Sequence, residues 1–169
     1  MHTVHISTPL GAMIVRSTEA GIRVLSFMGV ELQEGERIGR MSAPKSADEP
    51  TAIIDLLLSE LEQYFTGTLK KFTVPLDPVG TEFQLKVWKS LGTIPYGVTR
   101  SYKDQATNIG SIQAIRAVAT ANSANPIAIV IPCHRVIGTS GELTGYAGGL
   151  WRKRALLDLE RKETKPALF

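Results

Sequence analysis

The sequence predicts an α+β protein of two domains: a small β-sheet with one helix comes first, and a mainly helical half follows. Short apolar runs separated by turn residues fill the first 27 residues, as in a small sheet. Helical periodicity begins at Thr51 and dominates the chain after Gly80. Residues 77–80, Asp-Pro-Val-Gly, have the composition of a linker. We therefore expect domains at residues 1–79 and 80–169.

The first domain is predicted to begin with three strands. Val4 and Ile6 alternate with polar residues, and apolar runs at 12–15 and 22–27 follow Pro-Leu-Gly and Glu-Ala-Gly turns. Residues 29–50 are rich in Gly, Glu, Arg, Ser and Pro, which predicts a long or partly disordered loop.

A helix and a further strand complete this domain. From Thr51 to Gly67 the apolar residues recur at helical spacing, and residues 72–76 predict a short strand. The apolar stripe of the helix consists of Ile54, Leu57, Leu58, Leu61, Tyr64 and Phe65.

The second domain is predicted to hold a helix-turn-helix. A helix at 83–91 ends at Gly92, and two short helices at 101–108 and 112–122 flank a break at Gly110. This spacing matches a DNA-binding helix-turn-helix. An ordinary helical hairpin in a bundle has the same pattern and remains open as an alternative.

The end of the chain is predicted to place a cysteine after a buried strand. Residues 126–131 are apolar and predict that strand, which leads to Cys133. Residues 151–161 predict a last helix, and the tail at 162–169 is expected to be loose.

The composition excludes several classes of protein. The longest apolar stretch, residues 126–133, is far shorter than the roughly 20 residues of a membrane helix. Residues 1–10 contain no basic segment followed by an apolar run, so we expect no secretory signal there. Cys133 is the only cysteine in the chain, so an internal disulfide and a Cys-rich zinc site are excluded. We expect a cytoplasmic protein without metal or cofactor, since a free thiol fits that compartment.

Charge is distributed unevenly between the two halves. Residues 1–79 carry 7 Lys and Arg against 10 Asp and Glu, and residues 80–169 carry 12 against 6. The net charges are therefore −3 and +6, which add to the +3 of the chain. A basic second half is typical of a protein that meets a polyanion. An ordinary solvated surface would give the same count.

The segment around Cys133 contains the residues best suited to chemistry. A free thiol has a pKa near 8.5, so only a few per cent is thiolate at neutral pH. A neighbouring histidine such as His134 can accept the proton, provided that the chain turns there or a water bridges the two groups. The alternative is that Cys133 is a small buried hydrophobic residue.

The heptapeptide Pro-Cys-His-Arg-Val-Ile-Gly at 132–138 resembles the active-site signature of the O6-alkylguanine-DNA alkyltransferases. The likeness continues, in order and spacing, from residue 80 to residue 161. It implies a winged-helix-like second domain and DNA repair by stoichiometric transfer of an alkyl group. The further matching segments are 80–84, 87–88, 94–102, 116–118, 125–126, 143–149 and 153–160.

The resemblance implies roles for three residues in group transfer. Cys133 is the expected nucleophile, His134 removes its proton through a bound water, and Glu160 orients His134. Because a thioether is not hydrolysed as a thioester is, Cys133 is consumed once. O6-alkylguanine is the implied substrate, with O4-alkylthymine as a second one.

Further residues are implied to bind the base. Asn125 links the recognition helix to the cysteine segment, and Tyr102 donates a hydrogen bond to the guanine and contacts the DNA backbone. Tyr146 and Ala147 line the pocket, and the backbone carbonyls of Cys133 and Val136 accept from the guanine amine.

The helix at 112–122 is implied to lie in the minor groove of double-stranded DNA. Arg116 enters the space left by the flipped base. Ile115 and Ala119 are larger than the residues relatives usually carry there. The implied partner is duplex DNA carrying O6-alkylguanine, met by a monomer without membrane or obligate protein partner. The small residues expected to admit the DNA are Ala114, Ala117 and Ala121.

Three other functions fit parts of the sequence. A non-catalytic alkyltransferase-like protein binds lesions, but carries tryptophan in place of the nucleophile. A helix-turn-helix regulator with a redox cysteine would recognise one operator. A cysteine hydrolase acting on a small molecule would turn over a thioester and would need no basic helix.

Overall fold

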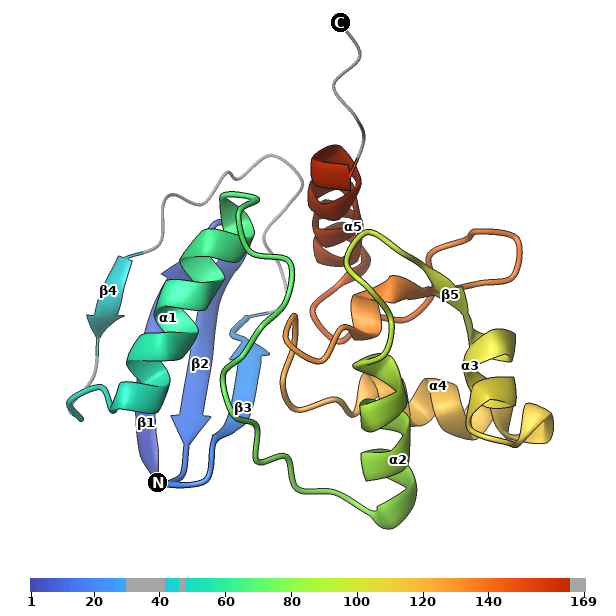
Figure 1. Cartoon of the computed structure of the whole chain (residues 1–169), viewed down its shortest axis with the longest axis horizontal. Helices are drawn as coiled ribbons and strands as arrows, with labels where there is room; N and C mark the ends of the chain where they lie inside the picture. Colours follow the sequence, from blue (N-terminus) through green and yellow to red (C-terminus); the bar gives the residue numbers. More distant parts are fainter. Residues whose placement is uncertain (30–41, 46–47, 165–169) are drawn as a thin grey trace, which may run out of the picture. The chain divides into compact units, whose positions relative to one another are not determined.

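The structure of the protein is a computed structural model that describes residues 1–29, 42–45 and 48–164. The chain divides into two compact units, Met1–Val79 and Gly80–Phe169. Figure 1 shows a sheet with a helix in the first unit and a set of short helices in the second. The α+β class predicted from the sequence is confirmed.

The first unit contains an antiparallel sheet with the strand order β3-β2-β1-β4. Val4 faces its β2 partner Val15, and both side chains are fully buried on the inner face. The three predicted strands are present. The strand bounds are β1 His2–Thr8, β2 Gly11–Ser17, β3 Ile22–Phe27 and β4 Ser42–Lys45.

Strand β4 corrects the prediction of a loop at 29–50. It pairs antiparallel with β1, where His5 faces Lys45 and Ser7 faces Ser42. Pairing with an edge strand supplies backbone hydrogen bonds that a polar composition does not reveal. The rest of the prediction concerns mainly residues 30–41 and 46–47, which lie outside the described residues.

Helix α1, Ala52–Phe65, contacts the sheet at β2 (Figure 1). The hydroxyl of Thr51 caps it by accepting a hydrogen bond from the backbone N–H of Ile54 at 3.3 Å. Its predicted apolar stripe is confirmed, since the side chains at four stripe positions are fully buried. These are Ile54, Leu57, Leu61 and Tyr64.

The strand predicted at 72–76 is absent apart from one bridge, between Leu76 and Ile22. The buried carboxylate of Glu60 accepts hydrogen bonds from the backbone N–H groups of Thr73 at 2.8 Å and Val74 at 3.1 Å. These donors are therefore satisfied by a side chain instead of a neighbouring strand.

The second unit is mainly helical, as predicted. Its first helix begins with a capping box, in which Thr81 and Gln84 exchange side-chain and backbone hydrogen bonds. A two-stranded parallel sheet accompanies the helices. The bounds are α2 Glu82–Leu91, β5 Arg100–Ser101, α3 Tyr102–Asn108, η1 Ile112–Ala114, α4 Ile115–Ser123, η2 Cys133–Arg135, β6 Val136–Ile137 and α5 Leu150–Thr164.

Helices α3 and α4 form the helix-turn-helix, and Gly110 lies in the turn with a φ of 87°. Gln105 and Asn122 lock the two helices together through reciprocal amide hydrogen bonds of 2.9 and 2.8 Å. The indole N–H of Trp88 on α2 donates to the carbonyl of Ala121 at 2.8 Å. Ala121 is only 3% exposed, so its assignment to the DNA-facing surface is wrong.

The strand predicted at 126–131 is also wrong, because this segment consists of turns and bends, with a single bridge residue at Ile127. Ile129 has a φ of 70°, which a β-branched residue rarely adopts. Pro126 and Pro132 lack the N–H that a strand would donate at each end of the run. The apolar composition of this segment correctly predicted that it is buried. Burial alone, however, does not distinguish a strand from a packed turn.

Helix α5 is longer than predicted and includes residues 162–164, which the sequence assigned to a loose tail. Residues 165–169, the rest of that tail, lie outside the described residues. Among the helices that the structure describes, none combines the length and apolar character needed to cross a membrane.

Candidate functional site

Cys133 begins the short 3₁₀ turn η2, and Asn125 holds the segment in place. The Asn125 amide donates to the carbonyl of Ile131 at 2.8 Å and to the Cys133 sulfur at 3.3 Å. Its carbonyl oxygen accepts from the backbone N–H of Ile127 at 3.0 Å. Asn125, which follows the end of α4, therefore bonds directly to the segment that carries the cysteine.

The environment of Cys133 favours the protonated thiol. Burial raises the pKa of Cys133, while the hydrogen bond from Asn125 and the positive charge of Lys153 oppose the rise. Burial raises a thiol pKa because the thiolate loses its hydration. A base is therefore needed to remove the proton when the sulfur reacts.

His134 lies in the same turn, and its ring is completely buried against α5. Its Nε2 lies 2.7 Å from Oε1 of Glu160. Since an ionised carboxylate only accepts, Nε2 carries the proton and Nδ1 is the free acceptor. Within the described part of the chain Nδ1 is buried without a hydrogen-bond partner. Burial lowers the pKa of His134, although Glu160 opposes this, so the imidazole is a neutral base.

Arg135 holds the Glu160 carboxylate from the other side. Its Nε lies 2.9 Å from Oε2, and its Nη2 lies 2.9 Å from Oε1. Its Nη1 donates to the carbonyl of Ile94 at 2.7 Å, and the backbone N–H of Gly97 donates to Oε2 of Glu160 at 3.2 Å. Burial would raise the pKa of Glu160, but His134 and Arg135 outweigh it and lower the pKa to about 2.

A loop before α5 is fastened by Lys153, whose side chain is fully buried. Its ammonium donates to the carbonyls of Thr144 at 3.0 Å and Gly145 at 3.4 Å. The hydroxyl of Tyr102 donates to the same Thr144 carbonyl at 2.8 Å. Burial lowers the pKa of Lys153 to about 8, although the negative charge on Cys133 opposes this.

The other residues expected to bind the base lie around this loop. The Tyr146 hydroxyl is buried, and no hydrogen-bond partner occurs for it among the residues described. Its pKa is raised well above the ordinary value by burial first and then by the charge on Cys133. Ala147 is exposed, and Val136 is buried in β6, where it pairs with Arg100 of β5.

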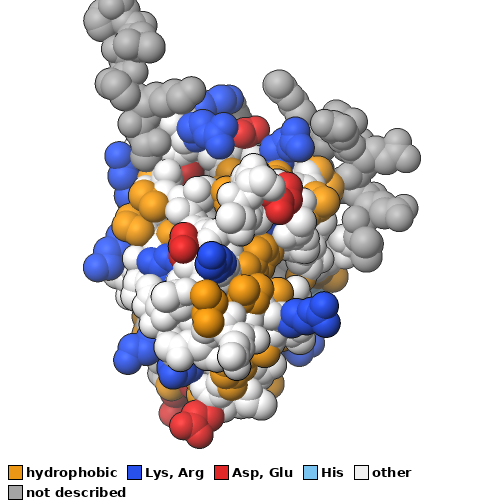
Figure 2. All heavy atoms as spheres, turned by 90° about the vertical axis from the view of Figure 1, so that its right-hand side faces the viewer, with side chains coloured by type: hydrophobic (Ala, Val, Ile, Leu, Met, Phe, Trp, Pro, Cys, Tyr) orange, Lys and Arg blue, Asp and Glu red, His pale blue; other side chains and the backbone are white. Residues whose placement is uncertain are grey.

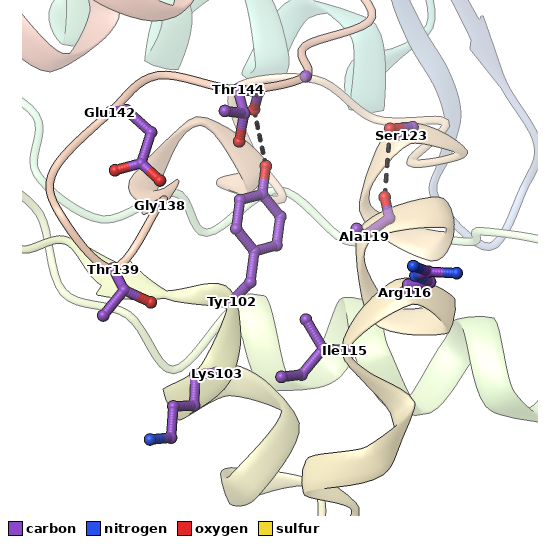
Figure 3. A pocket seen from close by; sticks show the side chains of 11 residues that line it. Tyr102, Lys103, Ile115, Arg116, Ala119, Ser123, Gly138, Thr139, Glu142 and Thr144 are labelled. Carbon is purple, nitrogen blue, oxygen red and sulfur yellow. Dashed lines mark hydrogen bonds between the residues drawn. The ribbon is translucent and has the colours of Figure 1, made fainter.

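A cavity of about 460 Å³ lies between the helix-turn-helix and the loop (Figure 3). Tyr102 and Thr144 stand on one side of it, and Ile115 and Ala119 of α4 stand on the other. Cys133 is not part of the cavity wall. Burial raises the pKa of Tyr102; the hydrogen bond to Thr144 opposes the rise, and the charge on Cys133 adds to it.

The surface of α4 carries the residues expected to contact DNA. Arg116 and Ala117 are exposed, and Ala114 is partly exposed. Figure 2 shows hydrophobic side chains on the face of the second unit, with Lys and Arg around them.

The charge count of this half overstates its surface charge. Arg135, Arg152 and Lys153 are buried. The carboxylate of Glu160 is buried as well, and it is neutralised internally by Arg135.

Sequence reasoning gave no role to Arg135 or Lys153. Arg135 directly follows His134, the predicted base. Its position next to a cysteine and a histidine was the sequence feature that could have indicated a role in the site. Lys153 opens the segment that ends at Glu160, and on the sequence alone it resembles an ordinary surface lysine of a helix. Only its burial in the structure distinguishes it.

Together these features define a helix-turn-helix protein whose single cysteine lies next to a buried histidine–carboxylate pair. Family models described as "6-O-methylguanine DNA methyltransferase, DNA binding domain" and "6-O-methylguanine DNA methyltransferase, ribonuclease-like domain" match residues 82–162 and 1–78. The chain belongs to the 6-O-methylguanine DNA methyltransferase family.

Curated relatives agree with this assignment. A methylated-DNA–protein-cysteine methyltransferase of Methanosarcina acetivorans is 45% identical over 160 residues, covering 95% of this chain and 98% of the relative. One of Mycobacterium leprae is 43% identical over 168 residues, covering 99% and 97%.

Solved structures share the fold. The O6-methylguanine methyltransferase of Mycobacterium tuberculosis is 43% identical, with a TM-score of 0.80 and coverage of 98% of this chain and 96% of that one. The structure of OGT from the same organism in complex with DNA gives 44% identity, a TM-score of 0.81 and coverage of 96% and 94%.

Proposed function

We propose that this protein repairs alkylated DNA by moving the alkyl group from O6 of guanine to the sulfur of Cys133. The family and the names of the relatives support this reaction. The observation that carries it is the ring of His134, which follows Cys133 in the same turn η2 and whose Nε2 lies 2.7 Å from the buried carboxylate of Glu160.

The first step is proton removal from the thiol. Nδ1 of His134 is the acceptor, and a bridging water carries the proton if the two groups do not touch. Glu160 stabilises the imidazolium that forms, and Arg135 keeps Glu160 ionised. The same division of roles operates in nucleophile–base–carboxylate triads.

The second step is an in-line displacement at the alkyl carbon. The bond between sulfur and carbon forms as the bond between carbon and O6 breaks, and guanine leaves with an additional electron pair. The proton taken from the thiol is returned to the base, so that ordinary guanine results. We assign a hydrogen bond to the departing base to Tyr102, whose hydroxyl exchanges its bond with the Thr144 carbonyl for one with guanine. The buried Tyr146 hydroxyl supports a second donor.

The alkylated guanine must leave the duplex to reach Cys133. Flipping a base out costs a few kcal/mol. We assign DNA binding and group transfer to the second unit, residues 80–169, in which the exposed Arg116 of α4 fills the vacated stack. The first unit has no residue assigned to chemistry.

The product is a thioether, which water does not hydrolyse as it does a thioester. Each molecule therefore acts once, and the partner is duplex DNA that carries O6-alkylguanine.

The test is intact-protein mass spectrometry after incubation with a duplex that contains O6-methylguanine. We expect one methyl group per protein, located on the peptide that holds Cys133, and none on Cys133→Ser. A duplex with O4-methylthymine tests the second substrate. More than one demethylated guanine per protein molecule would contradict the stoichiometric mechanism.

A further inference from the structure

Turn η1 and helix α4 together present apolar side chains beside Arg116. Ile112 is 51% exposed and Ile115 is 36% exposed, and Ala119 follows at helical spacing on the same side. Ile115 and Ala119 form part of the cavity wall. A single exposed apolar residue is ordinary, but Ile115 and Ala119 line a hollow together, and Ile112 extends the apolar surface beyond it.

The opposite wall of the cavity is polar. Tyr102, Thr139 and Thr144 lie there, with Lys103 at the edge. The charged residues that line the cavity are Lys103, Arg116 and Glu142, and the carboxylate of Glu142 is already bonded to Ser140. An apolar wall opposite a polar one with Lys103 at its edge fits a nucleotide, which has apolar sugar carbons and an anionic phosphate.

Ile115 and Arg116 point in different directions. Consecutive residues of a helix are separated by about 100° around its axis. In Figure 3 the side chain of Ile115 extends toward the side where Tyr102 and Lys103 lie, and that of Arg116 points away from it. If Arg116 fills the gap that the flipped nucleotide leaves in the base stack, Ile115 faces the flipped nucleotide.

We propose that Ile115 packs against the deoxyribose of the extruded nucleotide and, with Tyr102, holds that nucleotide out of the duplex. This inference rests on the proposed function. It makes Ile115 a contact to the nucleotide and not to the reacting atoms. The contact exists only when the base is attached to a DNA backbone, because the free base has no sugar.

The test compares the rate of Cys133 methylation by a duplex containing O6-methylguanine with the rate for the free base O6-methylguanine. Ile115→Ala removes most of the apolar contact. Leu85→Ala is the matched control, because Leu85 is 39% exposed on α2 and lies outside the cavity. Ile115→Val keeps the β-branch and most of the contact area.

For Ile115→Ala we expect the duplex rate at subsaturating DNA to fall by about tenfold. The rate with the free base is expected to stay at the wild-type value. The duplex rate of Ile115→Val should lie between those of the wild type and Ile115→Ala. Leu85→Ala should match the wild type with both substrates.

An unchanged duplex rate for Ile115→Ala, or an equal loss with both substrates, would overturn the inference while leaving the repair reaction intact. Absence of methyl transfer by the wild type from either substrate would instead refute the proposed function itself.

Discussion

Arg135 and Glu160 form a two-point ion pair in which neither side chain is more than 8% exposed. Two guanidinium nitrogens lie 2.9 Å from the two carboxylate oxygens, and Nε2 of His134 lies 2.7 Å from one of those oxygens. The charge of Glu160 is thus compensated by Arg135. This leaves His134 free to remain a neutral base.

Removal of the Glu160 charge is expected to slow methyl transfer strongly. In Glu160→Gln the amide no longer stabilises the imidazolium, so the single-turnover rate should fall by about 100-fold or more. The control is Asp158→Asn, which removes an exposed carboxylate from the same helix. Rates are measured by mass spectrometry of Cys133 methylation. A Glu160→Gln protein as fast as Asp158→Asn would refute the role of Glu160.

Removal of Arg135 is expected to destabilise the protein. Arg135→Met leaves the Glu160 carboxylate buried without its cation, which costs about 3 to 5 kcal/mol. Arg154→Met, at an exposed position of α5, should change the free energy of unfolding by less than about 0.5 kcal/mol. Both are measured by urea unfolding.

The double variant Arg135→Met with Glu160→Gln provides a second check. Its free energy of unfolding should be higher than that of Arg135→Met, because the buried, uncompensated charge of Glu160 is gone. If Arg135→Met and the double variant are equally unstable, the ion pair is not the cause of the destabilisation.

The rate of transfer is expected to depend on pH through His134. Because burial lowers the pKa of His134, the imidazole stays neutral below about pH 6.5, the ordinary value. The single-turnover rate should therefore persist below that pH and fall only in more acidic solution. Quench-flow measurements across the acid range test this. An inflection at or above pH 6.5 would contradict it.

The free energy of unfolding should decrease in acid because two groups, His134 and Glu160, have shifted pKa values in the folded protein. The folded-state pKa of His134 is depressed, so its unfolded form binds a proton first and stability falls once the pH drops below about 6.5. Glu160 contributes stability above its ordinary value of 4.5, and this is lost as the pH falls toward its folded pKa of about 2. Urea midpoints of the wild type and Glu160→Gln should converge in strong acid. Midpoints that keep a constant separation would argue against this linkage.

Asn125 is expected to control the reactivity of the sulfur without DNA. Asn125→Ala removes the donor 3.3 Å from Cys133, so the pKa of the thiol should rise and alkylation by iodoacetamide should slow by about tenfold. Asn108→Ala removes an exposed amide at the end of α3 and serves as the control. Equal alkylation rates for the two variants would show that the hydrogen bond to the sulfur has no effect.

Two predicted strands failed for the same physical reason. Apolar periodicity reports which side chains are buried, and it does not report where the backbone hydrogen bonds go. At 73–74 they go to the Glu60 carboxylate, and at 126–131 they go to local turns beside Ile129. Glu60 precedes Thr73 by 13 residues, so no local pattern indicates that it would replace a strand partner.

The sequence by itself determined that one sulfur is available, that a histidine follows it, and that two short helices flank a glycine. Those features are local, and their residue types and spacing restrict the chemistry. The resemblance implied that Glu160 orients His134, and the tertiary structure shows the contact between these residues, which are 26 positions apart. Only the tertiary structure decided that Arg135 and Lys153 are buried cations. Such contacts depend on which elements pack together, and their electrostatic effect depends on the loss of water around them.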